Sequence, residues 1–111
     1  MGGYQGSITL KEFEYKKDMP IDTGDLTDKT YEAILCEAER FNHDLTLQFG
    51  LLSYECKDET DYILKSKQLI DEMLIYDEVD LDDMFFGEPP AMKDFHEALH
   101  RILHNIDKLK I

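Results

Sequence analysis

The sequence predicts an all-α protein: an up-down-up bundle of three helices with a short N-terminal segment packed across it. Three observations support this. Apolar residues recur every three or four positions from Tyr31 onward. Residues that cap helices stand where the periodic stretches begin. The stretch that alternates as a strand would, at Ile8 and Leu10, has no partner strand. At 111 residues the chain is the size of one domain.

The first 25 residues are expected to form a flexible arm and connector, residues 1–25, ahead of a helical bundle domain at residues 26–111. The arm begins with a glycine-rich stretch. Residues 8–15 fit either a short helix or an extended segment laid across the core, and both alternatives stay open. Residues 16–25, which contain a proline and a glycine, are expected to connect this segment to the bundle.

A single long helix is predicted over about residues 28–56, with Thr27 suited to cap its start. Asn42, His43 and Asp44 are poor helix formers, yet the apolar phase passes through them without a slip. We therefore expect a continuous rod of roughly 40 Å, with a kink near Asn42 or Gly50 as the main alternative. The apolar positions are Tyr31, Ile34, Ala38, Phe41, Leu45, Phe49, Leu52 and Cys56.

Two further helices complete the predicted bundle. Asp58 can cap a helix at about residues 59–76, and the short link before it makes this helix antiparallel to the first. A loop is expected at residues 77–88. Two prolines then suit the start of a third helix, which carries an apolar stripe to about residue 109.

Charge excludes several functions. The chain has 25 acidic and 12 basic residues, a formal net charge of −13. Residues 58–88 hold eleven acids against two bases. Binding to nucleic acid or to an anionic membrane needs lysine and arginine, so neither is expected. Neither a membrane-spanning run nor a signal-peptide pattern is seen, and a cytoplasmic location is the expectation.

One face of the predicted rod is unexplained by a three-helix bundle. Leu47, Leu51 and Tyr54 fall opposite its main stripe, with Gly50 beside them. Leaving each large apolar side chain in water costs about 1.5–3 kcal/mol. Residues 8–15 could cover this face, or its exposure could be ordinary. The third alternative is a homodimer whose interface contains Leu47, Gly50, Leu51 and Tyr54.

The loop at residues 77–88 combines acidic and apolar residues and contains no base. Such a surface could dock a basic partner protein. In the alternative, the apolar residues close the end of the bundle while the acids remain solvated. The order of residues does not fit a calcium-binding loop. The acidic residues of this predicted docking loop are Asp77, Glu78, Asp80, Asp82, Asp83 and Glu88.

Metal ligation is the weaker chemical hypothesis. Glu97 and His100 have the Glu-x-x-His spacing of di-iron helical bundles. A second such motif is lacking, and Glu39 with His43 would only supplement the set. No cofactor or metal is therefore expected, and these four residues are the candidates should a metal bind.

The sequence thus predicts a non-enzymatic, acidic helical protein that acts by protein–protein interaction. Self-association as a homodimer is the main expectation, and docking of a basic partner is the second. A metal-binding helical protein or metal-dependent enzyme is the alternative from a different class. No nucleophile–base arrangement or phosphate-binding loop supports catalysis.

Overall fold

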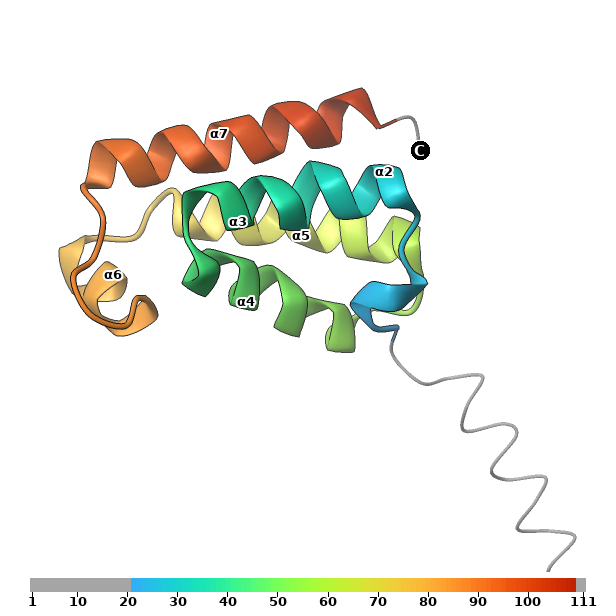
Figure 1. Ribbon diagram of the computed structural model, residues 1–111, viewed down its shortest axis with the longest axis horizontal. Coiled ribbons are helices and arrows are strands. Elements are labelled where there is room, and N and C mark those ends of the chain that lie inside the picture. The colour runs from blue at the N-terminus through green and yellow to red at the C-terminus, as the bar shows by residue number, and fades with distance from the viewer. Residues whose placement is uncertain (1–20, 110–111) are drawn as a thin grey trace, which may run out of the picture.

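A computed structural model describes residues 21–109 (Figure 1). All regular secondary structure in this range is helical, which confirms the all-α prediction. Residues 8–15, and the predicted arm up to residue 20, lie outside the described range. The helices are α2 (Asp28–Tyr31), a π-helical stretch η2 (Glu32–Cys36), α3 (Glu37–Phe41), α4 (His43–Leu52), α5 (Glu59–Met73), α6 (Glu78–Met84) and α7 (Met92–Lys108), with the 3₁₀ turns η1 (Thr23–Asp25) and η3 (Ser53–Glu55).

The predicted continuous helix over residues 28–56 is wrong. α2, η2 and α3 follow one another as one helix, which ends where Asn42 adopts an extended backbone with φ −166° and ψ 137°. The Asn42 side chain then accepts a hydrogen bond from the Asp44 N–H at 2.8 Å and caps α4. The chain therefore reverses at Asn42, and α4 runs back beside the first helix (Figure 1).

The reversal has a physical reason that the apolar phase conceals. Ile34 and Ala38 before the turn, and Leu45 and Phe49 after it, are all 0% exposed. A helix that folds back onto the same core keeps its apolar side directed inward, so the spacing of apolar residues does not change at the turn. Asparagine is among the best N-cap residues, and its position here decides the fold.

The observed bundle therefore has four long members instead of the predicted three. The first helix, from Asp28 to Phe41, packs against α4 and α7, and α5 packs against the same two. The first helix and α5 run in one direction, and α4 and α7 run in the other (Figure 1). The predicted bounds of α5 and α7 agree with the structure to within about three residues.

The predicted loop at residues 77–88 contains a helix, α6, which covers one end of the bundle (Figure 1). Asp77 and Asp80 cap its first turn reciprocally, each accepting the other's backbone N–H at 3.0 Å. Leu81 and Phe85 are buried. The Phe85 ring meets the rings of Phe41 and Phe95 edge to face, with centroids 6.4 and 5.8 Å away. These contacts fix α6 to the bundle end.

A carboxylate joins the start of α2 to the start of α5. Glu59 accepts hydrogen bonds from the Thr27 N–H at 2.8 Å, from the Thr27 hydroxyl at 2.8 Å and from the Thr30 hydroxyl at 2.6 Å. Thr27 is the N-cap residue, as predicted, but its own side chain caps no backbone group. Glu59 therefore satisfies this helix end from a distant element.

Candidate interaction surface

The outer side of α4 carries an apolar patch. Since Leu45 and Phe49 face the core, the side chains two positions from them along the helix must face outward. Leu47 is 41% exposed, and Leu51 and Tyr54 are each 60% exposed. These residues, with Gly50 between them and Tyr31 of α2 beside them, form what we call the α4 surface.

This surface surrounds a shallow groove of about 280 Å³. The reversal at Asn42 creates the groove, because it brings the first helix beside α4. Leu47, Gly50, Leu51 and Tyr54 line the same groove, as their spacing along the helix predicts. The contribution of the first helix is not predicted, because a straight rod would place that helix far from these residues. The lining residues are Thr23, Tyr31, Leu35, Thr46, Leu47, Gly50, Leu51, Ser53 and Tyr54.

Gly50 leaves backbone open in the middle of the patch. A β-carbon built at Gly50 would meet no other atom within 4 Å, so packing inside the described fold does not require glycine here. The absence of a side chain at Gly50 leaves the α4 backbone accessible at this point.

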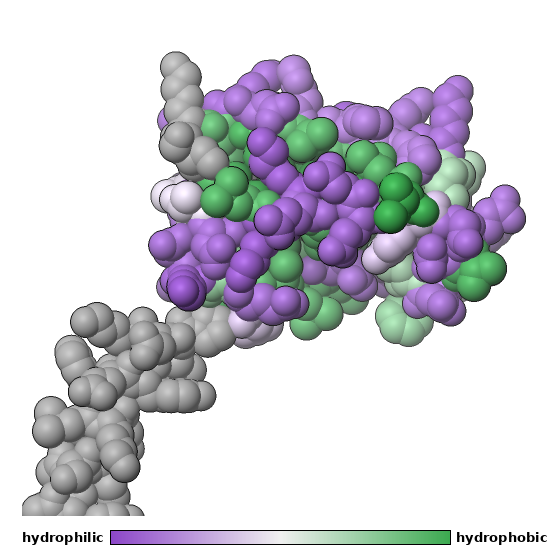
Figure 2. Space-filling view, turned by 180° about the vertical axis from the view of Figure 1, so that it is seen from behind, coloured by the Kyte–Doolittle hydropathy of each residue, from purple (hydrophilic) through white to green (hydrophobic). Residues whose placement is uncertain are grey.

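The part of the α4 surface that lies on α4 and η3 also lacks charged side chains. Residues 45–54 contain no charged side chain, the longest such run within residues 21–109. One third of the whole chain is charged. Much of the rear face is accordingly hydrophilic, with hydrophobic residues showing between the polar ones (Figure 2). Another acidic molecule would meet the least repulsion at residues 45–54.

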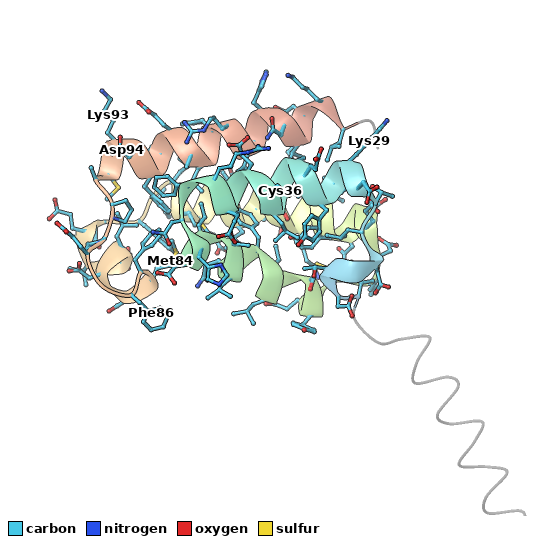
Figure 3. All side chains as sticks on the ribbon, viewed as in Figure 1. Lys29, Cys36, Met84, Phe86, Lys93 and Asp94 are labelled. Atoms are coloured by element: carbon cyan, nitrogen blue, oxygen red, sulfur yellow. The ribbon has the colours of Figure 1, made fainter. Side chains whose placement is uncertain are left out.

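The six acidic residues of the predicted docking loop are all exposed. Asp77 and Asp80 cap α6, while the other four form no ion pair with a basic side chain of residues 21–109. Val79 and Phe86 are 66% and 85% exposed among them. The Phe86 N–H donates to Asp44 at 3.0 Å, and its ring points away from the bundle (Figure 3). Leu81 and Phe85 thus close the end of the bundle, whereas Val79 and Phe86 remain exposed to solvent.

The four candidate metal ligands are not assembled into one site. Within residues 21–109, no group of three histidine, cysteine, aspartate or glutamate side chains is arranged to hold a metal ion. Glu39 and His43 instead contact each other across the Asn42 turn, with 2.9 Å between Oε1 and Nδ1. This hydrogen bond raises the pKa of His43 above its ordinary value. Glu97 and His100 lie exposed on α7.

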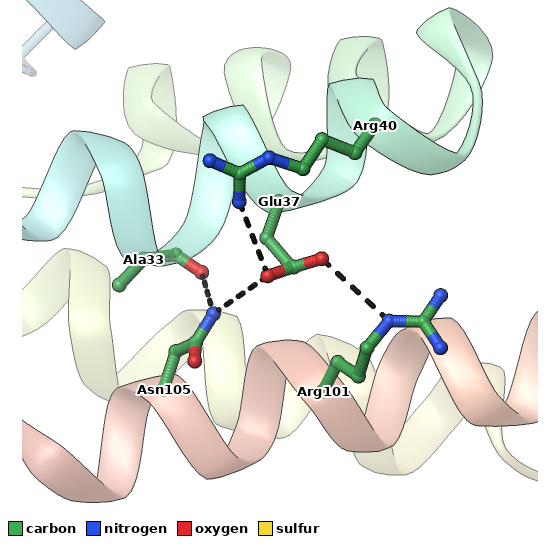
Figure 4. Close-up of polar contacts among 5 residues, drawn as sticks. All are labelled: Ala33, Glu37, Arg40, Arg101 and Asn105. Atoms are coloured by element: carbon green, nitrogen blue, oxygen red, sulfur yellow. Dashed lines mark hydrogen bonds and ion pairs between the residues drawn. The ribbon is translucent and has the colours of Figure 1, made fainter.

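A groove of about 510 Å³ on α7 includes Glu97 and His100, and three of its other lining residues, Glu37, Arg101 and Asn105, contact one another. The Glu37 carboxylate lies 3.3 Å from Arg40, 3.6 Å from Arg101 and 3.2 Å from the Asn105 amide (Figure 4). Asn105 also donates to the Ala33 carbonyl at 3.1 Å. These contacts hold α3 against α7. Glu37 does not stand out in the sequence, because Arg101 and Asn105 lie more than sixty residues away from it.

No family model, curated protein or solved structure matches the chain. Among the described residues, every helix is too short or too polar to cross a membrane.

Proposed function

We propose that this protein acts by self-association, with the α4 surface of one copy packed against the α4 surface of a second. The supporting observation is the grouping of four exposed apolar side chains, those of Tyr31, Leu47, Leu51 and Tyr54, around one groove beside the uncharged stretch of residues 45–54. Contiguous apolar patches of this kind mark protein-binding sites. A two-fold dimer uses the same patch on both partners.

The energy of such pairing is modest. Each of these side chains is about half exposed, so its complete burial would contribute roughly 1 kcal/mol, half of the full value. Eight side chains, four from each copy, would then contribute about 8 kcal/mol towards pairing.

The test compares two exposed leucines on different helices. Leu51→Glu places a charge in the α4 surface, whereas Leu64→Glu places one at a leucine of α5 that is 48% exposed. Both changes lie at the surface, so both variants are expected to fold. Sedimentation equilibrium over a wide concentration range should show dimers for the unchanged protein and for L64E, but monomers for L51E.

Thermal unfolding of each variant is the check that the fold is intact, and both variants are expected to unfold cooperatively. A wholly monomeric unchanged protein, or an L51E protein that pairs as well as L64E, would remove the proposed function.

Docking of a basic partner at α6 is the second candidate. The observation in its favour is the exposure of Val79 and Phe86 among acidic side chains that lack basic partners in the described part of the chain. Opposite charge would steer such a partner to α6, and the two apolar side chains would hold it.

A further inference from the structure

We propose that residues 8–15 of the same chain occupy the α4 groove in the single protein, and that a second copy must displace them in order to pair. This inference rests on the proposed self-association for its regulatory consequence. The occupancy of the groove itself does not depend on pairing and has its own measurement.

The chain enters the described fold beside the α4 surface. The Ile21 N–H donates to the Cys56 carbonyl at 3.0 Å, which fixes the entry point two residues from Tyr54. Thr23, two residues after Ile21, lines the groove. The preceding residues therefore leave the described fold at one end of the α4 surface.

The chain before Ile21 is long enough for residues 8–15 to reach the whole groove. Tyr15 precedes Ile21 by six residues, which span at most about 20 Å when extended at 3.3 Å each. The α4 surface from Leu47 to Tyr54 covers about 10 Å along the helix at 1.5 Å per residue. Residues 8–15 can therefore lie along the whole groove without drawing the chain taut.

The side chains of residues 8–15 are chemically complementary to the lining of the groove. Residues 8–15 contain four large apolar side chains, matched in kind to the lining of the groove. Residues 8–15 carry one base, Lys11, and two acids, Glu12 and Glu14, so their fit to the uncharged groove depends on the apolar side chains and not on charge. The four side chains are those of Ile8, Leu10, Phe13 and Tyr15.

The short tether gives residues 8–15 a high effective concentration at the groove. A segment joined to its site by a short length of chain has an effective concentration on the order of millimolar. A second copy competes with it only at its actual concentration. The tethered segment therefore occupies the groove preferentially wherever the protein is dilute relative to this value.

Covering of the groove by residues 8–15 strongly reduces the affinity of pairing, because the groove must be uncovered in both copies. If residues 8–15 cover the groove about nine-tenths of the time, only one chain in ten is competent to pair. The apparent dissociation constant of the dimer is then raised about 100-fold, since the fraction of open chains enters once for each partner. Any partner or modification that removes the segment would switch pairing on.

The experiment uses the full chain and two matched double variants. L10S/F13S removes two apolar side chains without changing net charge, and Q5S/T9S makes two polar changes in the same region as its control. Nuclear Overhauser contacts are measured at a concentration where sedimentation shows single chains. Contacts between Leu10 or Phe13 and the methyl groups of Leu47 and Leu51 are expected in the unchanged protein and in the control.

The sedimentation measurement then gives the predicted consequence. L10S/F13S should lose the contacts and dimerise about 100-fold more tightly, whereas Q5S/T9S should do neither. Leu47 and Leu51 methyl signals that are identical in the unchanged protein and in L10S/F13S would overturn the inference. So would contacts found only between differently labelled chains. If the contacts form but every variant stays monomeric, the occupant of the groove stands and the self-association falls.

Discussion

Glu59 shows how one side chain ties together helices that are distant in sequence. Its carboxylate accepts three hydrogen bonds from Thr27 and Thr30, and hydrogen bonds to a charged group contribute more than neutral ones. Partial burial would by itself raise the pKa of Glu59. The hydrogen bonds from Thr30 and Thr27 outweigh this effect and lower the pKa below the ordinary value of 4.5.

Glu59→Gln should therefore destabilise the protein by about 1–2 kcal/mol at neutral pH, because the charge that strengthens these hydrogen bonds is lost. A lowered pKa means that this stabilisation is complete above the unfolded value of 4.5 and disappears as the pH falls through the folded value. Urea unfolding at several pH values measures both effects. Glu55→Gln, a change at an exposed neighbouring acid, is the control. Equal losses for E59Q and E55Q at neutral pH would contradict the prediction.

At the scale of elements, the turn at Asn42 governs the architecture. Asn42→Ala removes the side-chain oxygen that accepts the Asp44 N–H, so about 0.5–2 kcal/mol of stability should be lost. Asn42→Asp retains an N-cap oxygen and should cost much less. Chemical unfolding measures both variants, and circular dichroism should show unchanged helix content because the core on both sides of the turn still holds the hairpin. An Asn42→Ala protein as stable as Asn42→Asp would show that the cap does not stabilise the turn.

The elements also show what sequence alone could predict. Asp58 and the stripe that follows it gave α5 correctly, since its cap and its periodicity agree. At Asn42 the two signals disagree: the cap residue indicates a new helix, whereas the unbroken apolar spacing indicates a continuous one. The spacing is misleading because a helical hairpin around one core preserves it. α6 was missed because seven residues carry too little periodicity to stand out. Its capping box at Asp77 and Asp80 was the available signal.

For the molecule as a whole, the exposure of three residues of the α4 surface is predicted, but from the wrong fold. Leu47, Leu51 and Tyr54 were expected to be exposed on the far side of a straight helix. They are exposed on the outer side of a helix that folds back. Tyr31 and Leu35 could not be assigned to the same groove, since only tertiary folding brings them beside α4. Helix periodicity tells which residues share a face, but not which faces meet.

Net charge gives a prediction that separates the two proposed modes of association. Two copies that each carry −13 repel one another, and salt screens this repulsion over a Debye length of about 10 Å at 0.1 M. Pairing through the charge-free α4 surface should therefore strengthen as sodium chloride is added. Docking of a basic partner on α6 should weaken, because salt screens an attraction. Sedimentation equilibrium across a salt series measures the first effect, with L51E as a control that remains monomeric throughout. A dimer that dissociates as salt rises would mean that opposite charges hold it together, and the α4 surface would then not be its interface.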